Sequence, residues 1–469
     1  MKMHVGGQWI GKDDVIEVLN PFDGAVVDTV PRAGTDDVTE AIATAVRGAE
    51  VMRRMPAFER YELLHKAADL MTERLDDLGR TITLEEGKIL PEGMGEAARA
   101  QETITLSAEE AKRLTGETLD LSAASNGAGK FGFTLRVPCG VVAAITPFNF
   151  PLNLVCHKVG PALAAGNAVL LKPASDTPLS GVKLVEIMLD AGFPPEAVSV
   201  VTGSGAAIGD AIASDERVRK ISFTGSRDVG EHICRTAGLK RVTMELGSNS
   251  PVVVMDDADL DKVAEGVTSS GFANAGQVCI SAQRILVEGA VYGDFIDALT
   301  PKVEGLTTGD PLKDGTTMGP MIRESDAERV EGWISDAISG GARLVTGGGR
   351  EGTLHQPTIL ADVSPAMRVS CDEIFGPAVA LTRVDDIDAA IAMANDTNYG
   401  LSASIFTQDI DRALKYAQQV ESGNIHINWG TQWRADLMPY GGLKESGMGK
   451  EGPRYTIHEM TETKMVVIH

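Results

Sequence analysis

Two stretches near the start of the chain carry apolar residues at the three- and four-residue spacing of an amphipathic helix. In residues 36–54 the apolar positions are Val38, Ile42, Ala45, Val46 and Ala49. In residues 58–80 they are Leu63, Leu64, Ala67 and Leu70. Each stretch therefore predicts one helix whose apolar face packs against the body of the protein.

From Gly140 the pattern changes to short, almost wholly apolar runs with longer segments between them. The first runs are residues 140–145, 167–171, 198–201, 220–223 and 242–246. After Pro251 a second series follows, at residues 251–255, 284–289, 342–348 and 401–406. Continuous apolar runs are typical of strands that are buried on both faces, and most of the intervening segments are long enough for a crossover helix. The sequence therefore predicts an α/β protein whose parallel sheet carries helices on both faces.

Length and composition set the class of protein. A chain of 469 residues exceeds one ordinary core, so we expect two or three domains. The 43% hydrophobic and 23% charged residues are typical of a water-soluble globular protein. No uncharged apolar stretch approaches the roughly 18 residues of a membrane span, so no membrane association is expected.

The formal net charge of -23 makes nucleic acid an unfavourable partner, because the protein's field repels phosphate. A few local Arg or Lys side chains can still form a positive pocket for an anionic substrate. The five cysteines are an odd set without a CxxC spacing, and no secretory leader precedes them. We therefore expect a cytoplasmic protein with reduced thiols. The eight histidines include no HExxH, so no metal site is predicted.

Cys279 is the candidate nucleophile. It lies in GQVCIS, between a helical run and a strand, and Gly276 would let the backbone approach a ligand closely. The alternative is an inert core cysteine. We interpret the other cysteines as structural; they are Cys139, Cys156, Cys234 and Cys371.

Several motifs accompany Cys279 in a fixed order. They are TPFNFPL (146–152), LKPAS (171–175), FTGS (223–226), MELGS (244–248), EIFGP (373–377) and PYGG (439–442). With Glu245 placed 34 residues before Cys279, the chain resembles the aldehyde dehydrogenase superfamily over essentially its whole length. The resemblance implies a Rossmann-type parallel-sheet cofactor domain, an α/β catalytic domain and a β oligomerisation arm.

The resemblance also implies a thioester mechanism that oxidises an aldehyde. Cys279 attacks the carbonyl carbon, and the oxyanion is held by the side-chain amide of Asn149 and the backbone N–H of Cys279. Glu245 is then the general base for hydrolysis, with a pKa raised by desolvation. Glu451 aligns with a carboxylate that relays protons with Glu245. Alternatives are a turn residue for Asn149, a salt-bridged helix start for Glu245 and a surface charge for Glu451.

The implied cofactor is NAD(P)+, although no GxGxxG follows the first strand and GSGAAIG (203–209) only approaches that spacing. The family places the pyrophosphate at the start of a helix within residues 225–230, beside Ser226. Lys172 is expected at the adenine-side ribose and Glu373 at the nicotinamide-side ribose. The other expected cofactor residues are Ile145, Thr146, Pro147, Phe148, Ser175, Phe223, Thr224, Gly225, Leu246 and Phe375.

Two positions depart from the commonest family pattern. Ser175 replaces a Glu that would repel a 2'-phosphate, so we expect NADP to be accepted. Ser248 and Asn249 replace the usual residues after Leu246-Gly247, and the sequence gives no account of them.

The expected substrate is a small polar or anionic aldehyde. His157 follows the family's Asn and makes the pocket polar, Trp433 and Arg434 lie in the loop that closes the substrate funnel, and Arg284 follows the nucleophile by five residues. A guanidinium can hold a carboxylate, phosphonate, phosphate or sulfonate. The pattern is similar to members that act on lactaldehyde, glyceraldehyde or its phosphate, phosphonoacetaldehyde and sulfonated aldehydes. Alternatively, Arg434 pairs with Asp436 or Glu445, and Arg284 only anchors its strand.

Two other functions are alternatives, a CoA-acylating dehydrogenase and a catalytically silent relative. Glu245 weighs against the CoA-acylating enzyme, and the joint presence of Cys279, Asn149 and Glu245 weighs against the silent relative.

For assembly, the resemblance implies a homodimer or homotetramer that pairs through a hairpin of residues 116–122 and 131–138 and a last strand at 464–469. The expected domains are residues 1–117 with 139–246 for NAD(P), 247–445 for catalysis, and 118–138 with 446–469 for the oligomerisation arm and the C-terminal strand.

Overall fold

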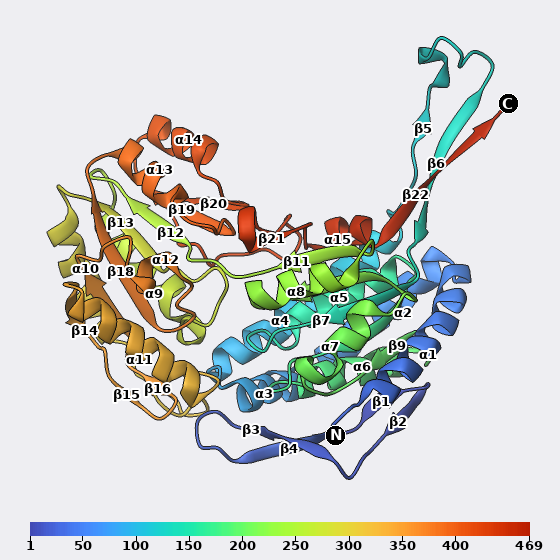
Figure 1. Ribbon diagram of the computed structural model, residues 1–469, viewed down its shortest axis with the longest axis horizontal. Coiled ribbons are helices and arrows are strands. Elements are labelled where there is room, and N and C mark those ends of the chain that lie inside the picture. The colour runs from blue at the N-terminus through green and yellow to red at the C-terminus, as the bar shows by residue number, and fades with distance from the viewer.

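The structure, a computed structural model that describes residues 1–469, contains two large sheets in the body and a third sheet that projects as an arm (Figure 1). The first large sheet has eight strands in the order β2-β1-β9-β8-β7-β10-β11-β21. Its five central strands, from β9 to β11 in this order, run parallel to one another. These strands are β1 (Met3–Val5), β2 (Gln8–Ile10), β7 (Val141–Ile145), β8 (Ala168–Lys172), β9 (Val198–Val200), β10 (Val218–Thr224), β11 (Arg241–Glu245) and β21 (Gly447–Met448).

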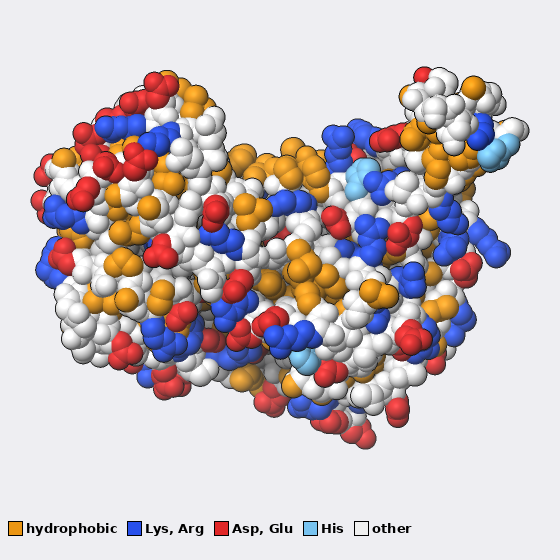
Figure 2. All heavy atoms as spheres, turned by 45° about the horizontal axis from the view of Figure 1, so that its top comes forward, with side chains coloured by type: hydrophobic (Ala, Val, Ile, Leu, Met, Phe, Trp, Pro, Cys, Tyr) orange, Lys and Arg blue, Asp and Glu red, His pale blue; other side chains and the backbone are white.

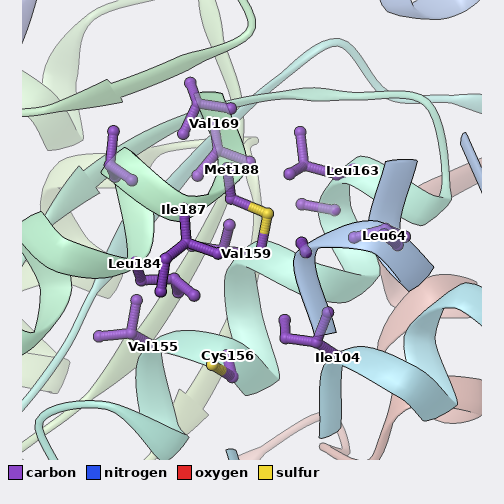
Figure 3. Packing of buried hydrophobic residues seen from close by; sticks show 14 of the residues in the cluster. Leu64, Ile104, Val155, Cys156, Val159, Leu163, Val169, Leu184, Ile187 and Met188 are labelled. Atoms are coloured by element: carbon purple, nitrogen blue, oxygen red, sulfur yellow. The ribbon is translucent and has the colours of Figure 1, made fainter. Parts of the chain in front are cut away.

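Alternation along the central strands gives this sheet two separate cores. Val142 and Ala144 of β7 face a core closed by α2, α4, α5, α6 and α15, whereas Val141 and Ala143 face α1, α7 and α8. Figure 3 shows the first core, where side chains of α5 meet those of α2, α4 and α6. The helices of this half are α1 (Thr35–Arg54), α2 (Ala57–Glu73), α3 (Leu75–Glu86), α4 (Leu90–Ala111), α5 (Asn153–Ala164), α6 (Leu179–Ala191), α7 (Gly205–Ser214), α8 (Arg227–Ala237) and α15 (Pro453–Glu459).

The second large sheet has seven strands in the order β14-β17-β18-β13-β12-β19-β20, all parallel except β14. The strands are β12 (Pro251–Val254), β13 (Arg284–Glu288), β14 (Arg343–Thr346), β17 (Thr358–Ala361), β18 (Ala378–Val384), β19 (Ser402–Phe406) and β20 (Asn424–Ile427). The helices are α9 (Leu260–Phe272), α10 (Tyr292–Glu304), α11 (Glu324–Ser339), α12 (Arg368–Cys371), α13 (Ile387–Asn395) and α14 (Ile410–Gln419). Two small hairpins complete the body: β3 (Val15–Leu19) with β4 (Val26–Pro31), and β15 (Arg350–Glu351) with β16 (Leu354–His355).

The predicted α/β class and the predicted strands are confirmed, but one predicted helix is wrong. Residues 58–80 form α2 and α3, separated at Arg74, whose backbone is not helical (φ -105°, ψ 16°). The break redirects the chain so that Leu78 and Ile82 of α3 are buried in the core that α4 also closes. No helix has both the length and the apolar character needed to cross a membrane.

The arm consists of β5 (Thr118–Leu119), β6 (Phe131–Pro138) and β22 (Thr461–Ile468). β22 pairs with β6 over its full length, whereas β5 contributes only two residues, because residues 121–123 form a 3-10 turn. Residues 447–459 differ from the expected arm. β21 adds to the edge of β11, and α15 packs on α5, so only β22 of that C-terminal stretch belongs to the arm.

Candidate active site

A cavity of about 470 Å³ is lined by the ends of β10 and β11 in the first large sheet, by helix α9 and the turn after it, and by the irregular chain after β20. Of the predicted residues, the cavity is lined by Cys279, Glu245, Glu451, Thr224, Trp433 and Arg434, whereas Asn149 is not among its lining residues. Glu245 is the last residue of β11, and the exposed Trp433 belongs to the irregular stretch after β20. The carboxyl ends of parallel strands are the usual place for ligands in such sheets.

A tight turn after α9 places Cys279. Asn274 and Ala275 have left-handed backbones (φ 50° and 52°), and Asn274 is fixed by its side-chain amide to Glu86 (2.8 Å) and its N–H to Glu92 (3.1 Å). Gly276 has φ +70°, and a Cβ there would lie 2.1 Å from the backbone oxygen of Gly376. Gly276 is thus required by a contact with the chain itself, and its approach to a ligand stays a prediction.

The thiol of Cys279 lies half-buried in the wall of the cavity. Its Sγ lies 3.1 Å from the hydroxyl of Tyr440. Burial raises the pKa of the Cys279 thiol to about 12, against the opposing effect of the Tyr440 hydrogen bond. The backbone N–H of Cys279 donates to no protein acceptor, so it is available to an oxyanion.

Asn149 is fixed by hydrogen bonds of both its side chain and its backbone. Its Nδ2 donates to the carbonyl of Gln277 (2.8 Å), which leaves a second N–H on the same nitrogen. Its backbone carbonyl accepts from the ammonium of Lys88 (2.8 Å), which also pairs with Glu96 (2.7 Å). The other Glu96 oxygen accepts the N–H groups of residues 152 and 153 at the start of α5. This network fixes the segment that carries Asn149.

Glu245 is a buried carboxylate without a partner. Neither of its oxygens has a hydrogen bond. Burial and the nearby charge of Glu451 raise the pKa of Glu245 well above its ordinary value. The predicted direction of this shift is confirmed, and the salt-bridged alternative is wrong.

Glu451 is equally buried, but its negative charge is balanced by two cations. It contacts Lys158 at 2.6 Å and Arg434 at 3.4 Å, so it is no surface charge. Burial alone would raise its pKa, but Lys158 and Arg434 outweigh burial and hold the pKa of Glu451 at about 2. A group that stays ionised near neutral pH does not readily take up a proton, which favours a positioning role over the predicted relay.

Arg434 lines the cavity with its guanidinium stacked 3.8 Å above the ring of Tyr440. Its partner is Glu451, whereas Asp436 is bound by Arg99 (2.8 Å) and His157 (2.8 Å). The predicted alternatives for Arg434, pairing with Asp436 or Glu445, therefore do not occur.

Two predicted substrate residues lie outside the cavity wall. His157 is fully buried behind Arg434 and Asp436, with Arg434 Nη2 3.2 Å from its ring. Arg284 donates to the carbonyls of Met393 and Ala394 at the end of α13. The prediction that Arg284 binds substrate is thus corrected in favour of its anchoring alternative, because its side chain points into the second half of the body.

The predicted cofactor residues gather at the carboxyl ends of the first sheet. β7 ends at Ile145, before Thr146, Pro147 and Phe148; β8 ends at Lys172 and β10 at Thr224, after Phe223. Helix α8 begins at Arg227, after Gly225 and Ser226, and the N–H groups of residues 227–229 donate to no protein acceptor. Such an N-terminus suits a pyrophosphate. A Cβ at Gly230 would lie 2.5 Å from a methyl group of Leu246, so glycine lets α8 pack closely against Leu246.

Glu373 and Ser248 lie together at a second hollow, which Phe375 also lines. The N–H of Ser248 donates to Glu373 (2.9 Å), and a Cβ at Gly247 would lie 2.3 Å from the same carboxylate. Burial raises the pKa of Glu373 to about 7 and lowers the pKa of Lys172 to about 8. The Ser175 hydroxyl donates to the carbonyl of Gly203 (3.0 Å). These residues fit a dinucleotide; no cluster of three or more His, Cys, Asp or Glu is arranged to bind a metal.

Sequence reasoning missed the parts played by Tyr440, Lys158, Lys88 and Arg99. Tyr440 belongs to the PYGG motif, but nothing local indicates that its hydroxyl reaches Cys279, 161 residues away. The one available signal was Lys158, a cation within the apolar run of α5 that must have a partner when buried.

A cofactor-binding sheet that faces a half-buried cysteine and an unpaired carboxylate defines a dehydrogenase with a cysteine in its active site. Residues 9–466 match the aldehyde dehydrogenase family model, and the chain belongs to this family. It is 46% identical to 3-sulfolactaldehyde dehydrogenase of Priestia megaterium, covering 100% of this chain and 98% of that one. It is 42% identical to the NADP-dependent succinate-semialdehyde dehydrogenase of Escherichia coli, covering 99% and 97%. Among solved structures, the NADP-dependent glyceraldehyde-3-phosphate dehydrogenase from Bacillus halodurans, complexed with NADP, superposes with a TM-score of 0.97 at 38% identity, covering 100% and 99%.

Proposed function

We propose that this enzyme oxidises a small aldehyde with an anionic group, of the 3-sulfolactaldehyde or succinate-semialdehyde kind, to its carboxylate with NAD(P)+. The observation that carries the proposal is Arg434. Its side chain is only 7% exposed, it lines the cavity together with Cys279, and its Nε has no hydrogen-bond partner. A buried donor without a partner is costly, and an anion in the cavity would relieve that cost.

The surrounding charges leave Arg434 available to a substrate. Glu451 already has Lys158 at 2.6 Å, closer than Arg434 at 3.4 Å. Asp436 is occupied by Arg99 and His157. The two curated relatives support the class of substrate, since both of their named aldehydes carry an anion, a sulfonate in one and a carboxylate in the other.

The chemistry begins at Cys279. Its thiolate adds to the aldehyde carbon, and the oxygen becomes an oxyanion that accepts from Asn149 Nδ2 and the Cys279 N–H. Because Gln277 and Lys88 already fix Asn149, these donors need no rearrangement. Bound NAD(P)+ would supply the hydride acceptor that oxidation of the aldehyde carbon to a thioester requires. Residues at the α8 N-terminus, Lys172 and Glu373 would hold it.

Glu245 completes the turnover. Its carboxylate removes a proton from a water that attacks the thioester carbon, and the product carboxylate leaves as the Cys279 thiolate is released. The raised pKa of Glu245 makes it a stronger base than an ordinary carboxylate. Lys158 and Arg434, held by Glu451, keep Glu245 close to positive charge without contacting it directly.

The arm supports assembly as a homodimer or homotetramer. Several apolar side chains of the arm are exposed, with Phe131 at 51%, Leu135 at 45% and Ile468 at 55%. Figure 2 shows hydrophobic atoms on the surface of the projecting arm. A narrow sheet exposed in this way is marginal by itself, so a second copy is its expected partner. We also infer a cytoplasmic location, because all five cysteines are free.

Initial rates of NAD(P)H formation test the function. 3-Sulfolactaldehyde and succinate semialdehyde would be compared with neutral aldehydes of matched length, without CoA, in the wild type and in Cys279→Ala, Arg434→Gln and the surface control Arg368→Gln. We expect the anionic aldehydes to dominate, Cys279→Ala to be inactive, and Arg434→Gln to raise KM for anionic aldehydes alone. Preference for the neutral aldehydes would refute anion recognition, and activity that requires CoA would refute hydrolysis.

A further inference from the structure

We propose that Tyr440 is a further catalytic residue, whose phenolic O–H donates a hydrogen bond to Cys279 Sγ and stabilises the thiolate. The inference rests on the proposed role of Cys279 as nucleophile. It starts from one contact: the hydroxyl lies 3.1 Å from the sulfur, and no other side chain is within hydrogen-bond distance of that sulfur.

The position of Tyr440 is fixed by its backbone and its ring. Tyr440 and Glu451 exchange two backbone hydrogen bonds, of 3.1 and 2.7 Å. The ring is only 3% exposed and packs in a small apolar cluster with Val278, Ile280 and Leu401. The guanidinium of Arg434 covers its face at 3.8 Å. The hydroxyl is therefore aimed at the sulfur by the fold and not by a flexible side chain.

The charges around Cys279 show why such a donor matters. Burial raises the pKa of the thiol, and the carboxylates of Glu373 and Glu245 raise it further, while Arg434 lowers it from a distance. Tyr440 is the one side chain that forms a hydrogen bond with the sulfur. Its own pKa is raised well above the ordinary value, chiefly by burial, so it keeps its proton and remains a donor. Arg434 withdraws electron density from the ring, which makes the O–H a better donor.

The direction of the bond changes when the thiol ionises. In the thiol form either the S–H or the O–H can be the donor. Once the S–H bond breaks and the proton passes to water in the cavity, only the O–H of Tyr440 can donate. A hydrogen bond to an ionised acceptor is roughly twice as strong as one between neutral groups. The contact therefore stabilises the thiolate more than the thiol.

Alkylation of Cys279 by iodoacetamide measures thiolate directly, without cofactor or aldehyde. The thiolate sulfur displaces iodide from carbon, and mass spectrometry of the Cys279 peptide gives the rate at each pH. Tyr440→Phe keeps the ring that packs on Arg434 and removes only the hydroxyl. The matched control is Tyr416→Phe, since Tyr416 is fully buried in another core and its hydroxyl has no partner.

We expect Tyr440→Phe to slow alkylation about tenfold at constant pH and to move the inflection of the pH profile upward, with Tyr416→Phe unchanged. Equal thermal melting of the two variants would establish that the fold is intact. An unchanged rate would refute the inference, and a faster rate would do so as well, because it would mean that the bond favours the thiol. If alkylated wild-type enzyme kept its turnover, the proposed function would fail instead, whatever the rate in Tyr440→Phe.

Discussion

Glu245 and Glu451 lie in one buried cluster, yet only Glu451 contacts cations. Glu451 has Lys158 at 2.6 Å and Arg434 at 3.4 Å, while neither oxygen of Glu245 has a partner. The pKa of Glu245 is consequently raised and the pKa of Glu451 lowered. Two carboxylates whose environments separate their pKa values can perform different tasks. Here Glu245 suits the role of a general base, and Glu451 suits that of an anchor for Lys158 and Arg434.

Glu245→Gln should separate acylation from hydrolysis. Without the base the thioester forms but is not hydrolysed, so rapid mixing should record a burst of NAD(P)H followed by turnover reduced about 100-fold or more. In the wild type, turnover should fall as pH decreases through the raised pKa of Glu245, because the base must be ionised. The control is Glu62→Gln, an exposed position on α2. Loss of the burst together with turnover would contradict this assignment.

Glu451→Gln should destabilise the fold, since it leaves Lys158 buried without its carboxylate. Removing one partner of a buried pair costs roughly 3–5 kcal/mol. The folded pKa of about 2 lies below the ordinary 4.5, so the stabilisation is present above 4.5 and is lost as pH falls through 2. Melting temperatures of wild type and variant should therefore differ most near neutral pH and converge in acid. The double variant Lys158→Met/Glu451→Leu should recover part of the loss; a difference independent of pH would contradict this account.

Ser175→Glu should shift cofactor use toward NAD. Ser175 lies just after β8 and near Lys172, where a carboxylate would repel a 2'-phosphate and accept from ribose hydroxyls. We expect the ratio of kcat/KM for NADP to that for NAD to fall about tenfold or more, as one unfavourable charge contact implies. Ser175→Ala removes the hydroxyl without adding charge and should change the ratio less. Equal effects of the two substitutions would show that charge at this position does not select the cofactor.

Charging the arm should separate the subunits. The double variant Phe131→Lys/Leu135→Lys places two cations on the exposed face of β6, and desolvating them in an interface is costly. Light scattering after size exclusion should then give a smaller mass than for the wild type. The control Glu62→Lys places a new cation at an exposed position on α2, outside the arm. A monomeric wild type, or an unchanged mass in the double variant, would contradict the proposed assembly.

The sequence predicted the parallel sheets well, because strands buried on both faces appear as continuous apolar runs, as in β7 and β12. It failed at Arg74, since the helical spacing of apolar residues continues on both sides of the break. The motifs located Cys279, Glu245 and Glu451, which the fold brings to one cavity. Arg284 misled because a position five residues along the chain says nothing about the side from which a strand presents its side chain.

The return of the chain through Tyr440, β21 and Glu451 to the edge of β11 has a consequence for folding kinetics. Cys279 and Tyr440, which are 161 positions apart in the sequence, must meet before the site is complete, and such distant contacts are slow to form. A refolding chain would regain most of its helical signal before its catalytic power. Turnover therefore reports the last stage of folding in this enzyme, and a recovered circular dichroism spectrum alone does not demonstrate a native site.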